Sequence, residues 1–562
     1  MNVIMGLPPF DARPDQYLAI DSEWFHMDAN RLHRPHGDFA CAQIAFENGD
    51  VYVITDPHDI PELLRRIDKG RWVLANAMFD IRQLRRYTEL SQRRLWDVIL
   101  IERDLFGGYY SSFGLDSLSN RYLGEYMEKD VRDDFAKLSE LTPETIQYAA
   151  RDALSTLRVG LAQMSYVKAN DVTLKHYWEA DLPCAWAMEE AKPARINVDA
   201  WAALADDFQA QADEIEKEFD FNPRSPVQVK SAIEARYKTR IRDTQEETLN
   251  ELIEKKPDLG LAQRVLEYRK YQKMASTYGH NWIEKYVEGD GYVYPEWKIT
   301  GALTGRVSCS DPALQTVPSK KMPIFRTMFI PHPKEEIMVN DVAQQEPRIL
   351  AKYSQDKKML ELIRSGISIH VGVGAELFGD PNFSKKSEQY PVAKALNLGL
   401  DYGLTASGLA RQLGIPVKLA EQHVENYFRK FPGVSVYMDT QRSIAMRKGY
   451  VTTLLGRRCY VNPYVYKWKN NAINSPVQGT GADQMKMAVA LVHQECKARG
   501  IPFSLMMMVH DENVSSHPKK MHKTYEKIIT EAWNEVGRAT LGDQIPLVLE
   551  FETGSNWGCK NG

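Results

Sequence analysis

The sequence predicts a multidomain protein of mixed α/β and α+β class. The chain has 562 residues, and a single hydrophobic core rarely grows to that size. Residues 1–170 alternate short apolar strands with helical stretches, whereas 171–290 is charged and carries apolar residues at helical spacing. Residues 291–562 combine apolar strands with long helices. We therefore expect an α/β domain, an elongated helical region and an α+β domain, in that order.

The first region begins as a sheet. The apolar run 17–21 is a predicted strand, and 39–46 and 51–55 form a predicted hairpin around an Asn-Gly-Asp turn. A further apolar run within 72–80 predicts another strand, directly before Asp80. A strand, a hairpin and following α/β units indicate a mixed sheet with helices packed on it.

The composition of the chain limits the class of protein and the cellular compartment that we expect. The net charge of −4 argues against a uniformly basic nucleic-acid binder, although a local basic groove combined with acidic metal sites is compatible with it. The six cysteines show neither CxxC pairs nor zinc-ligand spacing, which indicates free thiols in a reducing compartment. The N-terminal residues lack a signal-peptide pattern, and no run of about 18 apolar residues occurs. We expect a cytoplasmic protein without a membrane partner.

Acidic residues recur beside predicted elements of the first region. Asp21 and Glu23 lie two apart on a strand, so both side chains point to one face of the sheet. Tyr148 and Asp152 share one face of a helix, and Asp80 follows another strand. Any one of these carboxylates, taken alone, is more often an ordinary surface charge than a catalytic group. Together, carboxylates from such distant segments can bind two divalent cations about 4 Å apart for phosphodiester hydrolysis, with Tyr148 orienting the attacking water.

These residues lie in segments that match a known pattern. The sequences DSE, NAMFD and YAARD, with WDVILIERDL and LDSLSNRYLG between the second and third, resemble the motifs of proofreading 3′→5′ exonucleases with an Asp-Glu-Asp-Asp metal set. The resemblance covers about residues 15–165 and implies a ribonuclease-H-like fold. It also implies that the metal ligands are Asp21, Glu23, Asp80 and Asp152.

A second group of residues lies in the last region. Asp341 ends a predicted strand, and Asp511 lies in the apolar run LMMMVHDENV. A buried, unpaired carboxylate is costly, which makes both aspartates candidate ligands of a shared metal pair. Between them, Lys394, Leu398 and Tyr402 form one stripe of a predicted helix. Spacing alone favours an ordinary amphipathic helix over contacts to a phosphate, a base and a sugar.

Ordered motifs over nearly the whole chain reverse that preference. DVAQQEPRILA, KALNLGLDYG and VHDEN resemble the DYSQIELRVLA, KAINFGxxYG and VHDE motifs of A-family DNA polymerases. TGRVSCSDPALQTVP, SIHVGVGAELFG, GRRCY and NSPVQGTGAD match further motifs of that family, and FNPRSPVQV and KMASTY resemble its thumb motifs. The resemblance implies template-directed DNA synthesis by a right-hand polymerase with palm, fingers and thumb, together with proofreading.

The implied domains follow the order of these motifs. Residues 1–170 form the exonuclease domain, 171–290 the thumb and connecting region, 291–345 the first part of the palm, 346–432 the fingers and 433–562 the second part of the palm. The match does not include the 5′-nuclease domain found in front of many bacterial relatives, which makes the architecture phage-like by analogy. The expected role is genome replication, for a phage in the host cytoplasm, or DNA repair.

The resemblance also implies roles for residues around the second metal pair. Asp341 and Asp511 hold two Mg²⁺ ions, for which Mn²⁺ can substitute, and Glu512 lies beside them. The ions activate the primer 3′-OH and stabilise charge on the α-phosphate. Lys394 contacts the triphosphate and protonates the leaving pyrophosphate.

The implied nucleotide and DNA contacts are more numerous. The nucleotide contacts are His370, the main chain near Gln344, Leu398, and Glu346 paired with Tyr402 as a steric gate against a 2′-OH. The contacts near the primer terminus are Arg306, Arg457, Asn474, Gln478 and His510. The thumb contacts are Arg269, Lys270, Lys273, Ser276 and Thr277. Such contacts read base-pair geometry and backbone charge without reading sequence.

Two positions depart from the family's pattern. The usual arginine four residues before the lysine is replaced by Tyr390, so Lys385 or Lys386 is the expected substitute. Pro391 follows, and we expect it in the first helical turn, where its missing N–H costs little. An aromatic residue is usual where Leu398 stands.

Replacing Leu398 by phenylalanine tests the second departure. An aliphatic side chain cannot stack on the incoming base as a ring does, so we expect the native residue to slow incorporation or to alter sugar discrimination. Leu398→Phe should change the extension rate or the use of dideoxynucleotides by roughly two- to tenfold, because a ring pair contributes about 0.5–1.5 kcal/mol. Single-nucleotide extension measures both, and unchanged values for both contradict the prediction.

Three other functions are compatible with parts of the sequence pattern. In the first alternative, the C-terminal half is a degenerate DNA-binding scaffold behind an active exonuclease. In the second, it is a single-subunit RNA polymerase, a class that shares the palm and the lysine–tyrosine helix. Intact Asp341, Lys394 and Asp511 oppose the first, and Glu346 with the proofreading domain opposes the second. A non-enzymatic DNA-binding protein leaves both carboxylate groups unexplained. We expect a monomer whose partners are primer–template DNA, deoxynucleoside triphosphates, and a processivity factor or other replisome proteins.

Overall fold

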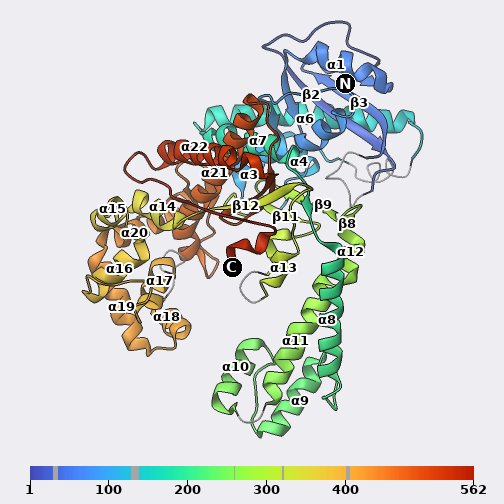
Figure 1. The fold of residues 1–562 in the computed structure, drawn as a ribbon. Helices are drawn as coiled ribbons and strands as arrows, with labels where there is room; N and C mark the ends of the chain where they lie inside the picture. The colour runs from blue at the N-terminus through green and yellow to red at the C-terminus, as the bar shows by residue number, and fades with distance from the viewer. Residues whose placement is uncertain (29–35, 128–137, 258–259, 319–321, 400–404, 562) are drawn as a thin grey trace.

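The computed structural model of the protein has an N-terminal α/β domain, a central palm, a finger lobe and an extended thumb (Figure 1). It describes residues 1–28, 36–127, 138–257, 260–318, 322–399 and 405–561. Within these ranges no helix is long and apolar enough to cross a lipid bilayer. The cysteines are free thiols, as the sequence predicts.

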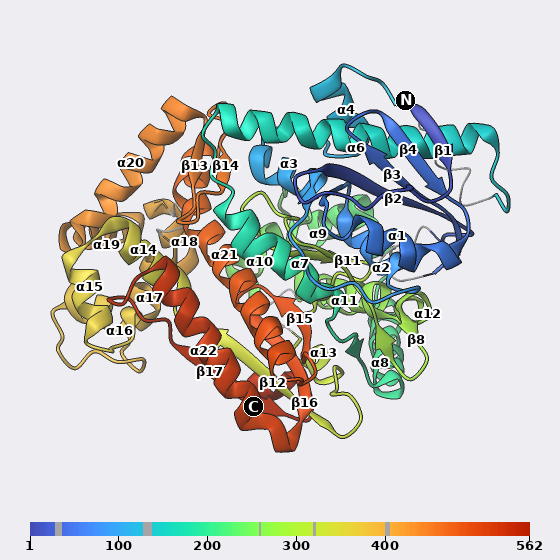
Figure 2. The ribbon, with the colours of Figure 1, turned by 90° about the horizontal axis from the view of Figure 1, so that it is seen from above.

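The N-terminal domain is built on a six-stranded mixed sheet with the order β1-β4-β3-β2-β5-β6. Its strands are β1 (Asn2–Met5), β2 (Tyr17–Phe25), β3 (Asp38–Phe46), β4 (Asp50–Ile54), β5 (Arg71–Leu74) and β6 (Trp96–Asp97). Its helices are α1 (Ile60–Ile67), α2 (Ala77–Leu84), α3 (Val98–Phe106), α4 (Leu115–Leu123) and α6 (Pro143–Ala169). The antiparallel pairs β2–β3 and β3–β4 confirm the predicted strand and hairpin. Helix α6 packs on β2 and β3 (Figure 2).

The strand predicted before Asp80 is wrong in its extent. Strand β5 ends at Leu74, and Asp80 lies in the first turn of helix α2. The helix begins after Asn76, which has a left-handed backbone with φ of 61°. Its first N–H groups are capped by the carboxylate of Asp97, which accepts from Ala77 N at 2.8 Å. A cap supplied from so far along the chain leaves no signal in the local apolar pattern.

The thumb confirms the predicted helical region. Helices α8 (Val198–Glu216) and α11 (Leu261–Tyr278) pack against each other as a stalk (Figure 1). The other helices of this region are α7 (Leu182–Glu189), α9 (Pro226–Tyr237), α10 (Glu246–Lys255) and α12 (His280–Tyr286). A small sheet of β7 (Ala194–Arg195), β9 (Tyr292–Val293) and β8 (Val287–Glu288) lies at its base.

The palm is a four-stranded antiparallel sheet with the order β15-β16-β12-β17. Its strands are β12 (Glu335–Val342), β15 (Leu505–Val509), β16 (Glu512–Pro518) and β17 (Leu549–Gly554). Helices α21 (Trp468–Ala498) and α22 (His522–Thr540) pack together beside it (Figure 2). Short elements around the palm are β10 (Glu296–Lys298), β11 (Ser308–Ser310), β13 (Tyr450–Thr452), β14 (Arg458–Tyr460) and α13 (Ile324–Thr327).

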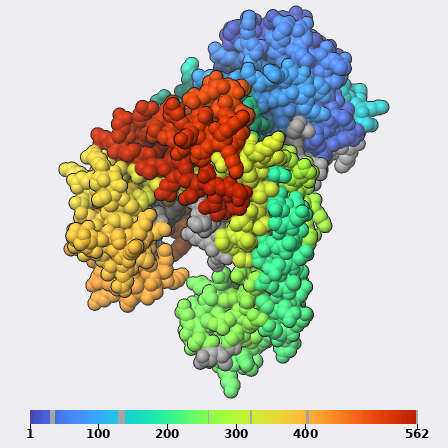
Figure 3. Space-filling model, viewed as in Figure 1, coloured from blue at the N-terminus to red at the C-terminus, as the bar shows by residue number. Residues whose placement is uncertain are grey.

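The finger lobe is helical and shares an apolar core with the palm helices. It contains α14 (Gln345–Ser354), α15 (Lys357–Arg364), α16 (Ile369–Phe378), α17 (Tyr390–Gly399), α18 (Ala406–Leu413), α19 (Val417–Lys430) and α20 (Pro432–Lys448). Figure 3 shows that the surface is hollowed between this lobe and the thumb, below the palm. The core of the N-terminal domain extends to Trp186, and the domain boundaries stay predictions.

Two candidate active sites

The first predicted carboxylate pair lies on β2. Asp21 and Glu23 are half-buried, and Glu23 is paired across the sheet with Cys41 of β3. Burial, and after it the charges of Glu23 and Asp21, raise the pKa of the Cys41 thiol above its usual range. The structure therefore brings both carboxylates close to one point on the sheet.

Asp80 joins this pair through the residue between them. Its carboxylate accepts a hydrogen bond from Ser22 Oγ at 2.6 Å, and the side chain is 2% exposed. Burial raises the pKa of Asp80 to about 7, although the hydrogen bonds from Ser22 oppose the shift. A carboxyl group in this state gains its charge readily when a cation binds beside it.

Tyr148 and Asp152 complete the set from α6. They lie one turn apart on the helix that packs against β2 and β3. The helix begins with a capping box between Thr142 and Thr145, which satisfies its first N–H groups and fixes its start. The predicted residues thus lie on three adjoining elements, and their role as metal ligands stays a prediction.

Sequence reasoning missed two residues that position this site. Ser22 holds Asp80, and no sequence signal marks it. Asp97 is 5% exposed and accepts hydrogen bonds from the main-chain N–H groups of Asn76, Ala77, Ile99 and Leu100. It joins the starts of α2 and α3, and its place before an apolar helical run is a usable cap signal.

The second carboxylate pair lies at neighbouring ends of palm strands. Asp341 is on the central strand β12, directly across from Glu512 of β16. Because Val509 pairs with Glu512, His510 and Asp511 form a two-residue turn. His510 has a φ of 59°, a left-handed conformation that costs of order 1 kcal/mol or more and clusters at functional sites. The turn leaves Asp511 exposed at its tip.

Glu512 has partners that the sequence did not reveal. Its carboxylate is 4% exposed and accepts hydrogen bonds from Arg326 Nη1 at 2.8 Å and Trp557 Nε1 at 3.1 Å. The Arg326 guanidinium also lies over the Trp557 ring, 4.1 Å from its centroid. These contacts fix the Glu512 side chain beside the strand that carries Asp341. Its catalytic role stays a prediction.

A cavity of about 510 Å³ opens beside Asp511. The predicted residues that line it are Arg306, Gln344, Glu346, His370, His510 and Asp511. Gln345 also lines it and donates to Gln484 Oε1 of α21 at 3.0 Å, which joins two walls of the cavity. The start of helix α14 forms part of the lining, and free N–H groups at such a start favour anions.

His370 is prepared as a neutral donor. Burial, and after it the charges of Lys394 and Lys385, lower its pKa to about 4. Asn397 Nδ2 donates to His370 Nδ1 at 2.9 Å, so the ring proton of the neutral form is on Nε2. The Gln344 side chain fixes the start of helix α16, which carries His370, because Gln344 Oε1 accepts a hydrogen bond from Ile369 N at 3.0 Å.

The structure describes only some of the other residues that were predicted to contact the nucleotide. Glu346 accepts a hydrogen bond from Arg306 Nη2 at 2.8 Å. Its predicted partner Tyr402 lies outside the described residues, as does the side chain of Leu398. Lys394 is exposed on α17, and Pro391 lies in the first turn of that helix, as predicted.

The predicted DNA contacts fall into two groups. On α21, Asn474 and Gln478 lie on the stripe that continues to the cavity wall at Gly481 and Met485. Asn474 Oδ1 is buried without a hydrogen-bond partner among the described residues. On α11, the exposed thumb positions are Lys270, Lys273, Ser276 and Thr277.

Arg457 and Arg269 are not placed with these groups. Arg457 is 3% exposed and binds the buried carboxylates of Asp104, Asp181 and Asp483. Arg269 is half-buried and donates to Thr244 in the loop before α10. A guanidinium that is 3% exposed and enclosed by three carboxylates is out of reach of a DNA phosphate, so the structure corrects the prediction that Arg457 contacts DNA.

Comparisons with known proteins find a family match for each of the two parts of the chain. Residues 198–559 match the family described as DNA polymerase family A, and residues 11–163 match a 3′-5′ exonuclease family. The chain is 29% identical to DNA polymerase I of Pseudomonas aeruginosa over 99% of this chain and 65% of the relative. It is 27% identical to DNA polymerase I of Aquifex aeolicus over 91% of this chain and 92% of the relative.

A solved structure shares the fold. The POL domain of Pol1 from M. smegmatis, in complex with DNA primer-template and dNTP, matches with a TM-score of 0.84 and 24% identity over 98% of this chain and 97% of that chain. The chain spans between about half and two thirds of the length of several curated relatives, 46% of one and 65% of another. The family match covers more than half of the chain, and this protein therefore belongs to DNA polymerase family A.

Proposed function

We propose that the protein is a DNA-directed DNA polymerase that extends a primer 3′-OH on a template and removes mismatched termini with its 3′→5′ exonuclease. The observation that carries the proposal is the palm site. Asp341 lies across from Glu512 near the end of β12, and Asp511 lies in the turn directly before Glu512. Asp511 and the neutral donor His370 both line the cavity of about 510 Å³. The proposed substrates are primer–template DNA and deoxynucleoside triphosphates.

The donor sets of both sites fit a hard divalent cation. Carboxylate oxygens are the ligands that Mg²⁺ and Mn²⁺ prefer, and the proposed ligands in the palm are Asp341 and Asp511. Those in the exonuclease domain are Asp21, Glu23, Asp80 and Asp152. Bound Mg²⁺ supplies Lewis-acid activation of the attacking oxygen and neutralises charge on the phosphate.

The chain's own residues position the reactants. His370 donates from Nε2 to a phosphate oxygen, and Lys394 on the same side supplies positive charge and a proton for pyrophosphate. Lys385 lies close enough to lower the pKa of His370, and it takes the place of the family's missing arginine. In the exonuclease site, the Tyr148 hydroxyl orients the water that attacks the terminal phosphodiester.

The proposal is tested with matched and mismatched primed templates in Mg²⁺, with and without deoxynucleotides. We expect extension with nucleotides, shortening without them, and trimming of the mismatched end before extension. Chelation should abolish both reactions. Shortening without any extension would support a scaffold behind an exonuclease, and equal use of ribonucleotides would support an RNA polymerase. We place these reactions in the cytoplasm of a cell that replicates or repairs DNA, with the protein acting as a monomer.

His370→Ala should raise the KM for the deoxynucleotide by about 10- to 100-fold. The lost hydrogen bond goes to a charged phosphate, and such bonds contribute about 1.5–3 kcal/mol. Single-nucleotide extension over a range of nucleotide concentrations measures the change. His58→Ala, an exposed histidine of the N-terminal domain, is the control, and an unchanged KM in His370→Ala contradicts the assignment.

Lys273→Ala should weaken primer–template binding in a salt-dependent way. A lysine that contacts a phosphate releases about one counterion, so the slope of log affinity against log salt should fall by about 1. Fluorescence anisotropy at several salt concentrations gives the slope. Lys69→Ala removes an exposed charge of the N-terminal domain and should leave the slope unchanged; equal slopes in both variants would remove Lys273 from the DNA-contacting surface.

A further inference from the structure

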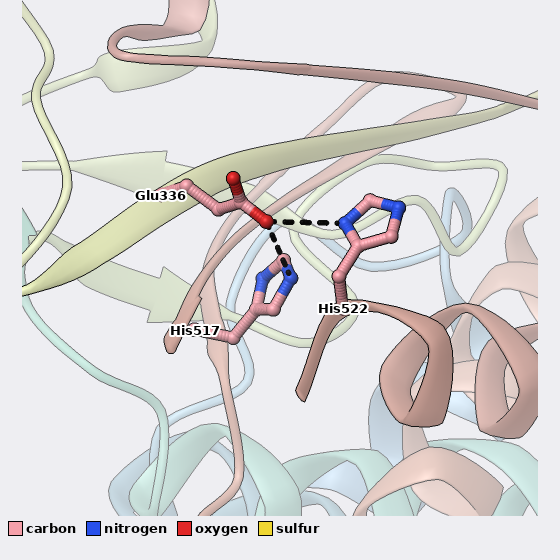
Figure 4. Close-up of side chains that lie close together, drawn as sticks. All are labelled: Glu336, His517 and His522. Atoms are coloured by element: carbon pink, nitrogen blue, oxygen red, sulfur yellow. Dashed lines mark hydrogen bonds and ion pairs between the residues drawn. The ribbon is translucent and has the colours of Figure 1, made fainter. Parts of the chain in front are cut away.

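A third group of ligating side chains lies outside both active sites. Glu336 is on β12, and His517 is its direct partner across the sheet on β16. His522 is the first residue of α22. Figure 4 shows that the three side chains converge, with the Glu336 carboxylate between the two imidazole rings.

The distances suit one bound ion. Glu336 Oε1 lies 3.2 Å from His522 Nδ1 and 3.6 Å from His517 Nε2. The ligand atoms of all three residues lie within 4.8 Å of one another. In a tetrahedral site with metal–ligand bonds of about 2.0–2.1 Å, neighbouring ligand atoms are about 3.3 Å apart. One ion at the centre of the group can therefore reach all three after small side-chain movements.

His517 gives a separate reason to expect a ligand. Its side chain is fully buried, and neither ring nitrogen has a hydrogen-bond partner among the described residues. The 3.6 Å approach to Glu336 is longer than a hydrogen bond. A neutral imidazole ring has a lone pair to offer to a metal ion. Buried polar groups in native proteins are normally satisfied, and a metal ion would satisfy one of the two ring nitrogens.

The surroundings keep the group available. The nearby cation Lys192 binds both carboxylate oxygens of Glu335, at 2.7 Å each, and not those of Glu336. On α22, His522 Nε2 faces Glu526 Oε2 at 3.8 Å. A histidine that binds a metal through one nitrogen usually has a carboxylate or carbonyl beside the other, and Glu526 is in that position.

We propose that Glu336, His517 and His522 bind a single divalent transition-metal ion of the Zn²⁺ class, with a fourth position open to water. Imidazole nitrogens select Zn²⁺ and its neighbours over Mg²⁺, so this site is distinct in chemistry from the carboxylate sites. The ion would tie β12 and β16 to the start of α22. Since Asp341 is on β12, its effect would be to stiffen the sheet that carries the palm carboxylates.

Metal retention by the full chain tests the proposal. The protein is stripped with a chelator, loaded with Zn²⁺ in excess Mg²⁺ to occupy the carboxylate sites, gel-filtered and measured for zinc. We expect the parent and the control His58→Ala to retain one equivalent more than His522→Ala and Glu336→Gln. Equal retention in the parent and His522→Ala, or no retention in the parent, would overturn the proposal and leave an ordinary Glu–His ion pair.

Two further measurements separate binding from folding and from the proposed function. His522 is 31% exposed, so His522→Ala should fold, and its circular dichroism and Tm in chelator should equal those of the parent. Zn²⁺ should then raise the Tm of the parent and of His58→Ala but not that of His522→Ala, because only a ligand of the native state stabilises it. An equal rise in all three places the ion elsewhere. Substituting Co²⁺ should give a tetrahedral visible spectrum in the parent and in His58→Ala but not in His522→Ala, whatever the outcome of the extension assays.

Discussion

Asp341→Ala is expected to reduce primer extension by about a thousandfold or more and to leave exonuclease activity within about twofold. Asp341 is the last residue but one of the inner palm strand β12 and lies opposite Glu512, beside the turn that presents Asp511. A catalytic metal ion supplies several kcal/mol of transition-state stabilisation, and each 1.36 kcal/mol lost slows the reaction tenfold. Single-turnover extension of a matched primer and degradation of the same primer without nucleotides measure the two activities.

The reciprocal variant makes this result specific to the site. Asp21→Ala should abolish shortening of the primer and leave extension intact, because Asp21 lies on β2 of the N-terminal sheet. Asp199→Ala, an exposed aspartate at the start of α8, should affect neither activity. If Asp341→Ala retained extension within tenfold, another residue would have to hold the ions, and the palm assignment would be wrong.

The sequence places the predicted carboxylates other than Asp80 on or beside the right element, because each of these lies next to a strong local pattern. Asp21, Glu23 and Asp341 lie on strands whose apolar runs are visible in the sequence, and Asp152 lies on a long helix. Asp511 follows an apolar run that the structure confirms as β15. A charged residue beside an apolar element stands out, so these positions could be predicted from one sequence.

Positions fixed by distant partners could not be predicted in the same way. Asp80 was expected after a strand, yet it lies in α2, because Asp97 caps the start of that helix from a later segment. The Asn397 amide that fixes the tautomer of His370 comes from another helix. Neither contact has a characteristic spacing, since hydrogen bonds between elements depend on how the elements pack.

The surroundings of Arg457 could not be predicted either, although the residue itself lies in a recognised motif. The motif GRRCY predicts that an arginine is present, but not which groups surround it. The groups that it binds come from segments 353, 276 and 26 residues away along the chain. They join α3 of the N-terminal domain, the residue before α7, and α21 of the palm.

Arg457→Met is expected to lower the free energy of unfolding by about 3–5 kcal/mol, because removing one partner of a buried ion pair leaves uncompensated charge. Burial, and after it the charge of Asp181, raises the pKa of Asp104 well above its usual range, against the effect of Arg457. Burial also opposes ionisation of Asp181, yet Arg457 and Lys486 outweigh it and hold that pKa below its usual range. Without the guanidinium, Asp181 must ionise beside Lys486 alone or take up a proton, and either state costs stability at neutral pH.

Urea unfolding followed by tryptophan fluorescence measures the loss, and Arg499→Met is the matched control. Arg499 pairs with Glu495 and Glu531 at the surface, where such pairs contribute about 0–1 kcal/mol. Adding Asp104→Asn to Arg457→Met should restore part of the stability, because it removes one of the carboxyl groups that lose their partner. A DNA-contacting role predicts the opposite pattern, with weaker primer–template binding and unchanged unfolding. Since the carboxylates around Arg457 come from the N-terminal domain, the connecting segment and the palm, we expect the loss to appear first at the junction of the two enzymatic domains, as faster limited proteolysis there.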